Sequence, residues 1–392
     1  MSRPVFSVDP HGRLANQMIQ YLVALKFVDL LGGDCDISGV KLPAWGIHHP
    51  KIESPGPVAS YSSEHHMQLD SLVEKLRTGQ ARRVDWAGYG QRMENFLPRE
   101  RYRDTFRSPF DRPMGFGPDH LVCPIRAEDI LHGETPDYVL TPVEFYRDVV
   151  AMTGLNPVFI GQTHPNAYMD RIRATFPAAI IREPQQDALV DFETIRQSRH
   201  VVVGVSTYAW LAAWLSDAVE TIYLAVSGLF HPRQKRNVDL LPFGDQRYRF
   251  FPFPINYAVP LERHAEAHRR IAPFWHLHTH ELIQRQLATV PQLKWSVEDA
   301  LDVFDEDFYL QANADVARVA DREGRQFARD HFRHFGFNEG RVGMRLDPHW
   351  YATRYPLAAY EVGRCDFVDF AHHYHAIGRA RGYSSVPKEN EW

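Results

Sequence analysis

The residues best suited to hold an anion stand near the start of the chain, at positions 11–17 (HGRLANQ). A glycine between a strand and a helix lets backbone N–H groups approach a ligand closely, and a helix start favours negative charge, so Gly12 fits a phosphate-facing loop. Arg13 adds a fork of donors suited to phosphate or carboxylate. Asn16 and Gln17 can each donate and accept hydrogen bonds. We expect these four residues to bind a phosphate-bearing ligand; an ordinary strand, turn and helix with one glycine is the alternative.

A second group of charged residues, Arg126, Glu128 and Asp129, follows the apolar run 121–125. An arginine at the carboxyl end of a strand can bind a pyrophosphate bidentately and stabilise the charge that develops on a leaving nucleoside diphosphate. We therefore expect Arg126 to be catalytic and Asp129 to help bind the donor of such a transfer. A surface salt bridge among the three residues is the alternative interpretation.

A third group, Ser206, Thr207 and Tyr208, follows the β-branched run 200–205 and begins a helix-patterned segment. Ser206 can cap that helix, while Thr207 and the backbone N–H groups of the first turn face a phosphate. We expect all three residues to contribute to donor binding. In the alternative interpretation Ser206 is only a helix cap and the tryptophans that follow belong to the core.

A transfer to a hydroxyl group benefits from a general base. The candidates near these loops are Asp9, His11, Glu128 and Asp129. His11 is favoured as a catalytic residue, because imidazole changes its charge near neutral pH and this histidine belongs to the first loop. A loop histidine exposed to water is the alternative.

Three histidines at alternate positions, His276, His278 and His280, suggest a metal site at first sight. Only the first and third would share a helical face, and no carboxylate or cysteine completes the set. We expect a surface or packing role for them and no metal in the active site. Since no D-x-D sequence is flanked by strand signals, Arg13 and Arg126 would replace a cation in neutralising a diphosphate.

The elements that would position these loops alternate between strand and helix from residue 119 to residue 226. Such alternation predicts a parallel sheet covered on both faces, with ligands at the carboxyl ends of its strands. Before it, one strand (Val5–Val8) and one helix (Leu14–Leu31) precede a proline-rich stretch where few long elements fit. The predicted strands of the alternating region are 121–125, 158–160, 178–181, 200–205 and 221–226, and its predicted helices are 143–152, 169–176 and 209–215.

The C-terminal part contains a sequence repeat with a period of 42 residues. Each unit predicts a short aromatic helix, a connection, and a second helix that ends at glycine. Such units stack into a small helical array, which would pack against the preceding helix, bind protein partners or self-associate. The matching positions are Asp305 and Asp347, Tyr309 and Tyr351, His331 and His373, Gly336 and Gly378, and Gly340 and Gly382.

The composition limits the class of protein. A chain of 392 residues, 44% hydrophobic and 12% aromatic, suits a globular protein of two or three domains. A net charge of −5 and a pI near 6.5 provide no broad basic field, so nucleic acid is not an expected partner. Three widely spaced cysteines favour buried thiols in a reducing compartment. With no signal peptide and no apolar run long enough to span a bilayer, we expect a cytoplasmic protein without an integral membrane segment.

The three loops together resemble the bacterial α-1,2-fucosyltransferases and related fucosyltransferases over about residues 5–226. Positions 12–17 are similar to the family's G-R-L-G-N-Q motif, positions 124–129 occupy the place of its H-x-R-R-x-D motif, and positions 204–215 resemble its N-S-S-F-S-W-W-x-A-W-L segment. The C-terminal repeat resembles the aspartate-aromatic-tyrosine repeats appended to various bacterial polysaccharide glycosyltransferases. Both resemblances point to surface glycan synthesis.

The chain also departs from these motifs. Pro124 and Ala127 replace the histidine and second arginine of the central motif, whereas Arg126 and Asp129 keep its first arginine and its aspartate. The resemblance therefore supports a nucleotide-sugar site more strongly than it supports fucose. The other replacements are Ala15 for glycine, Val205 for asparagine and Leu211 for tryptophan.

The resemblance implies an α/β fold of the GT-B type, a pair of Rossmann-type domains followed by a small helical repeat domain. The expected divisions are an acceptor-side domain at 1–117, a domain for the donor nucleotide sugar at 118–262, a connecting helical segment at 263–295 and the repeat domain at 296–392.

The function implied is that of an inverting, metal-independent glycosyltransferase without a cofactor. It would transfer a sugar, fucose from GDP-fucose in the family, from a nucleotide sugar to a bacterial surface polysaccharide or oligosaccharide. Another deoxyhexose and a transfer to protein stay open. The alternative is a catalytically decayed transferase domain that acts as a glycan-binding or assembly protein through its repeats.

Overall fold

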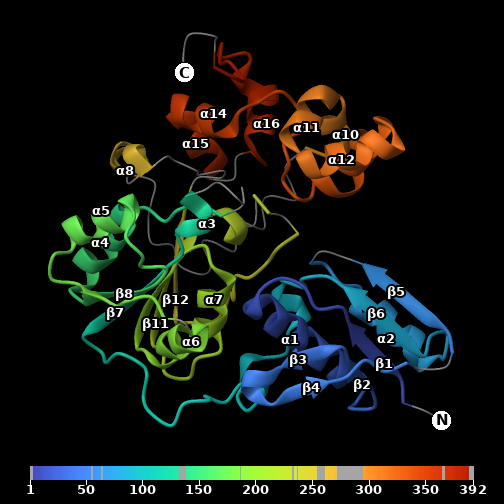
Figure 1. Cartoon of the computed structure of the whole chain (residues 1–392). Helices are drawn as coiled ribbons and strands as arrows, with labels where there is room; N and C mark the ends of the chain where they lie inside the picture. Colours follow the sequence, from blue (N-terminus) through green and yellow to red (C-terminus); the bar gives the residue numbers. More distant parts are fainter. Residues whose placement is uncertain are drawn as a thin grey trace.

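The computed structural model describes residues 3–53, 56–62, 65–131, 138–185, 187–231, 234–235, 237–253, 261–271, 295–363 and 367–387. Over these residues the chain is an α/β protein with parallel sheets, as predicted, followed by a group of C-terminal helices. Figure 1 shows those helices, coloured orange to red, gathered at one end of the molecule.

The N-terminal sheet has four parallel strands in the order β2-β1-β6-β5. The strand predicted at Val5 and the helix predicted at Leu14 are confirmed as β1 and α1. The strands of this part are β1 (Val5–Val8), β2 (Asp36–Ser38), β5 (Val58–Ser62), β6 (Arg83–Ala87) and the antiparallel pair β3 (Val40–Leu42) and β4 (Ile47–His49). Its helices are α1 (Leu14–Leu30) and α2 (Leu69–Arg77), with 3₁₀ turns at Pro43–Trp45, Met93–Asn95 and Arg99–Tyr102.

The expectation of few long elements beyond residue 31 holds for the strands there, which are short, but the sequence did not show that β2, β5 and β6 join β1 in one sheet. These strands have only three to five residues each, and the edge strand β5 has no fully buried residue. So short a strand shows little apolar periodicity, and its neighbours in the sheet decide its conformation. The prolines that suggested loops lie between the strands.

The second sheet has six strands in the order β12-β11-β10-β7-β8-β9, and all of its pairs are parallel. The alternating strands and helices predicted between 119 and 226 are confirmed, with boundaries shifted by a few residues. The sequence did not predict α3 and α6 within this region, or β12 beyond it. The strands are β7 (His120–Ile125), β8 (Asn156–Gly161), β9 (Ile180–Ile181), β10 (His200–Val203), β11 (Thr221–Val226) and β12 (Tyr248–Pro252). The helices are α3 (Glu128–Leu131), α4 (Val143–Thr153), α5 (Ala167–Thr175), α6 (Ala188–Gln197), α7 (Thr207–Trp214) and α8 (His264–Ile271), with 3₁₀ turns at Gly228–Phe230 and Leu261–Arg263.

The strand order of the second sheet creates a preferred place for a ligand. The chain runs outward from β7 through β8 to β9 and then returns to β10 on the other side of β7. Helices therefore leave β7 and β10 in opposite directions, which opens a crevice at the carboxyl ends of these two strands. Arg126 follows β7 and Ser206 follows β10.

Helices α1 and α7 pack the two sheets against each other within one continuous apolar core. The rings of Trp210 and Trp214 on α7 stack with centroids 5.5 Å apart, and Phe96 lies against both. At the rim, Arg99 and Arg103 both pair with one carboxylate on the other part, Asp217, at 2.9 Å. This interface fixes how the carboxyl edges of the two sheets face each other.

The C-terminal helices show the same contacts at positions 42 residues apart. The hydroxyl of Tyr309 is hydrogen-bonded to His331 Nδ1 at 3.0 Å, and that of Tyr351 to His373 Nδ1 at 2.9 Å. The predicted connection between the helices of each unit is itself helical. The elements are α10 (Val297–Leu301), α11 (Glu306–Ala312), α12 (Ala314–Glu323), α13 (Gln326–His331), α14 (Pro348–Arg354), α15 (Pro356–Gly363) and α16 (Phe370–His373), with π-helical turns at Phe332–Gly336 and Tyr374–Gly378.

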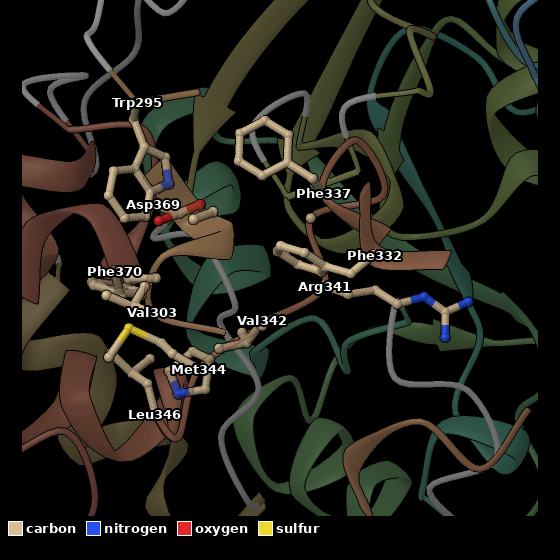
Figure 2. A pocket seen from close by; sticks show the side chains of 15 residues that line it. Trp295, Val303, Phe332, Phe337, Arg341, Val342, Met344, Leu346, Asp369 and Phe370 are labelled. Carbon is tan, nitrogen blue, oxygen red and sulfur yellow. The ribbon is translucent and has the colours of Figure 1, made fainter. Parts of the chain in front are cut away.

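The two units meet around a small hollow lined mainly by apolar side chains. Figure 2 shows Phe332 and Phe337 of the first unit, Leu346 and Phe370 of the second, and Trp295 around it. The shared lining makes the hollow a packing seam between units that each have a small core of their own.

Two predictions about the chain as a whole are answered in part. Cys35 and Cys123 are free, buried thiols, while Cys365 lies outside the described residues. Within the part of the chain that the structure describes, no helix combines the length and the apolar character needed to cross a bilayer.

Candidate functional site

Two arginines from different sheets meet at one carboxylate. Arg126 comes directly after β7 and contacts Asp129 on α3 through its Nη2 at 2.5 Å and its Nε at 3.2 Å. Arg13, in the loop after β1, brings its Nη1 to 3.9 Å from Asp129 Oδ2. The face of the Arg126 guanidinium lies over the ring of Tyr138, 3.7 Å from its centroid. The structure thus brings together residues that the sequence analysis had placed in separate loops.

The three side chains differ in their exposure to water. The side chain of Asp129 is 9% exposed and that of Arg126 is 21% exposed, whereas that of Arg13 is 78% exposed. The hydrogen bond from Arg126 lowers the pKa of Asp129 further than burial raises it. Burial lowers the pKa of Arg126, but the hydrogen bond to Asp129 and its charge outweigh this and raise it. Arg126 and Asp129 therefore stay ionised at neutral pH, and together with the guanidinium of Arg13 the three side chains have a formal charge of one positive unit.

The salt bridge that the sequence offered as an alternative is therefore present between Arg126 and Asp129. It does not exclude a ligand, because a guanidinium has five N–H donors and Asp129 occupies only one side of it. The buried carboxylate and the Tyr138 ring hold the fork in one orientation. Such a preoriented fork suits a planar or bidentate anion.

His11 is held in a defined orientation at the carboxyl end of β1. Its Nδ1 lies 2.9 Å from the backbone oxygen of Asp9, and its ring meets the edge of Tyr89 with centroids 4.6 Å apart. A carbonyl oxygen only accepts, so Nδ1 carries the proton and Nε2 is the basic nitrogen of the neutral ring. The buried amide of Gln20 donates to the carbonyl groups of His11 and Gly88 and accepts from the N–H of His11.

The remaining residues of the first loop make contacts within the protein. Asn16 Oδ1 accepts from Gln91 Nε2 at 3.0 Å, and Gln17 Nε2 donates to the carbonyl of Gly12 at 3.0 Å. Gly12 has φ +76°, and a Cβ there would lie 2.4 Å from Asn16 Nδ2. These contacts shape the loop, and Gly12 is required for its conformation.

The third loop begins α7 as predicted, with Ser206 as its cap. Ser206 Oγ accepts from the N–H of Ala209 at 3.3 Å. Thr207 is buried, and the hydroxyl of Tyr208 donates to the carbonyl of Ala188 on α6. Burial raises the pKa of Tyr208, so its hydroxyl stays protonated. The loop that carries them follows β10, the neighbour of β7 at the point where the crevice opens.

Two residues of the loop after β8, which lie against the turn that carries Arg126, were not predicted from the sequence. His164, in the loop after β8, brings Nδ1 to 2.8 Å from Glu128 Oε1. Gln162 Oε1 accepts from the N–H groups of Ala127 and Glu128 at 2.7 and 3.0 Å. The sequence did contain a signal for them, because Gln162 and His164 are polar residues directly after the strand 156–161. Neighbouring parallel strands end at the same edge of a sheet, so these residues could have been expected near Arg126.

No group of three or more His, Cys, Asp or Glu side chains that could hold a metal ion occurs among the described residues. His276, His278 and His280 lie outside them. The divisions expected at 117, 262 and 295 stay predictions, although the two sheets and the C-terminal helices fall on either side of them. Neither a family model nor a curated protein matches the chain.

Proposed function

We propose that the chain is a glycosyltransferase that uses a nucleoside-diphosphate sugar. The observation that supports it is the meeting of Arg13 and Arg126 at Asp129, where the carboxyl edges of two parallel sheets face each other. A diphosphate could bridge both guanidinium groups and so hold the two loops together. As the bond to the sugar breaks, negative charge grows on the diphosphate, and fixed guanidinium groups stabilise that charge.

The acceptor hydroxyl would lose its proton to His11 Nε2. The Asp9 carbonyl fixes the tautomer that leaves this nitrogen basic, and Tyr89 and Gln20 fix the position of the ring and its backbone. A base on the N-terminal sheet and a leaving group held on the six-stranded sheet would stand on opposite sides of the reacting carbon. This arrangement suits inversion by direct displacement.

The fold assigned with this function is the GT-B type, with the N-terminal sheet on the acceptor side and the six-stranded sheet on the donor side. The three motif resemblances support a GDP-linked donor, with GDP-fucose as the first sugar to test. The resemblance of the C-terminal repeats supports an acceptor that belongs to a bacterial surface polysaccharide or oligosaccharide, and a repeat domain that assists its assembly. Neither a metal nor a cofactor is assigned a step in this mechanism.

A thermal-shift screen against GDP, UDP, TDP and CMP and their sugars tests this proposal. A ligand at one hundred times its dissociation constant stabilises a folded protein by roughly 2.7 kcal/mol, which is a shift of several degrees. We expect a shift with one diphosphate and its sugars, and its loss in Arg13→Ala, whose exposed side chain contributes little to the fold. Arg103→Ala, which removes an exposed arginine that pairs with Asp217 at the rim of the contact between the two sheets, should keep the shift. If no nucleotide stabilises the unaltered protein, the transferase proposal is wrong.

A further inference from the structure

The loops after β7 and β8 are joined beside the two arginines. Gln162, in the second loop, accepts hydrogen bonds from the N–H groups of Ala127 and Glu128, and His164 pairs with the Glu128 carboxylate at 2.8 Å. Glu128 is the chain neighbour of Asp129, which holds Arg126. The imidazole of His164 therefore lies beside the turn that carries Arg126 and Asp129 of the proposed diphosphate site.

The geometry of this pair leaves one nitrogen available. A carboxylate only accepts, so His164 Nδ1 carries a proton that it donates to Glu128, and Nε2 is not used by this contact. The side chains of His164 and Glu128 are 62% and 43% exposed. An exposed pair of this kind contributes little to stability, so either residue can be replaced without unfolding the protein.

The charges around the pair predict what a bound anion would do. Arg13 and Arg126 carry two positive charges, while Glu128 and Asp129 carry two negative ones, so the cluster is neutral when His164 is neutral. A diphosphate brings at least two negative charges to it. Negative charge nearby favours the protonated form of an imidazole, and Glu128 already faces its other nitrogen.

We propose that His164, held by Glu128, is a third contact for the diphosphate of the donor and takes up a proton when that diphosphate binds. The inference rests on the proposed function, because it assigns a further residue to the same site. Protonated Nε2 donates a charge-assisted hydrogen bond to a phosphate oxygen, and the cluster then carries one positive charge. When the diphosphate leaves, the proton returns to solvent.

The protons taken up on binding are measured by calorimetric titration in two buffers of different ionisation enthalpy. The ligand is the nucleoside diphosphate that the screen selects, for which GDP is our first expectation. We expect net uptake at pH 7 for the unaltered protein, its loss in His164→Asn, and binding at least tenfold weaker in that variant. Glu128→Gln, which keeps an acceptor but removes the charge, should reduce the uptake. The terminal phosphate of this ligand also titrates, but it is the same in every variant, so the differences between variants report on the protein.

His66→Asn is a matched control. His66 and Glu94 form a similar pair in the N-terminal part, at 2.9 Å with side chains 62% and 47% exposed, so the replacement should leave both proton uptake and affinity unchanged. If the selected diphosphate binds the unaltered protein and His164→Asn binds it equally well with the same uptake, the inference is wrong and the proposed function stands. If the unaltered protein binds none of the nucleotides in the screen above, both are wrong.

Discussion

Arg13 and Asp129 approach to 3.9 Å although one follows a strand of the N-terminal sheet and the other a strand of the six-stranded sheet. The contact crosses the place where both sheets present the carboxyl ends of their strands. Because the Arg13 side chain is 78% exposed, this contact adds little to stability by itself. The contact matters for geometry, since it brings an exposed guanidinium to the same carboxylate that holds Arg126.

Replacing Asp129 by asparagine should weaken both folding and nucleotide binding. The pKa of Asp129 is held below its usual value, so the ionised group stabilises the fold above about pH 4, and that contribution is lost as the pH falls through its folded pKa. We expect Asp129→Asn to lower the free energy of unfolding at pH 7 by about 1–3 kcal/mol, and by less near pH 3. Urea denaturation at the two pH values measures this. An equal loss at both would show that the charge of Asp129 does not stabilise the fold.

Asp191 should behave in the opposite way. It lies on α6, 3.7 Å from Arg182, and burial raises its pKa to about 6. A raised pKa means that its contribution to stability is complete below about pH 4 and is lost as the pH rises through about 6. Relative to Asp191→Asn, the unaltered protein should lose about 2 kcal/mol of stability between pH 4 and pH 7. Parallel denaturation curves across this range would contradict the prediction.

Substitutions at Ser206 distinguish its role as the cap of α7 from a role in binding the ligand. Loss of a serine cap costs about 1 kcal/mol, so the variant should unfold at lower urea concentration. If Ser206 is only a cap, Ser206→Asp, which preserves an acceptor for the N–H of Ala209, restores stability and leaves nucleotide affinity unchanged. If Ser206 also faces the phosphates, as we expect, the added charge in Ser206→Asp weakens nucleotide binding at least tenfold while stability recovers.

Gly340, in the first repeat unit, lies against the backbone of Gln234 in the part that carries the six-stranded sheet. A Cβ at Gly340 would lie 1.8 Å from the backbone oxygen of Gln234, and φ there is +75°. Gly382, at the equivalent position of the second unit, has φ +74° and open space around it. Both alanine variants should lose about 1 kcal/mol to backbone strain. Only Gly340→Ala should also increase the protease sensitivity of the segment between the sheet and the repeat; equal sensitivity in both variants would exclude docking at this point.

The sequence predicts most of the six-stranded sheet, because its strands are buried on both faces and alternate with helices of ordinary length. It does not predict β5 or β6, whose few residues depend on pairing with β1. The physical reason is that a longer strand inside a covered sheet carries its signal in its own residues, whereas a strand of three to five residues depends on pairing with partners far away in the chain.

The contacts of the candidate site also divide into local ones, which the sequence shows, and long-range ones, which it does not. The pair formed by Arg126 and Asp129 lies within one turn and is visible in the spacing of the two residues. The contact of Arg13 with Asp129 depends on how two sheets pack, and that of His164 with Glu128 depends on β8 lying beside β7. The spacing of residues in the sequence shows neither of these two contacts. For this reason Arg126 could be predicted as a site residue and His164 could not.

The proposed diphosphate site can be tested by calorimetric titration. The nucleoside diphosphate that the screen selects is titrated into the unaltered protein, into Arg126→Lys and into Arg103→Lys. Lysine keeps the positive charge at position 126 but loses the fork that Asp129 and Tyr138 orient. We predict binding at least tenfold weaker in Arg126→Lys and unchanged in Arg103→Lys. Equal affinity in all three proteins would contradict a diphosphate held by Arg126.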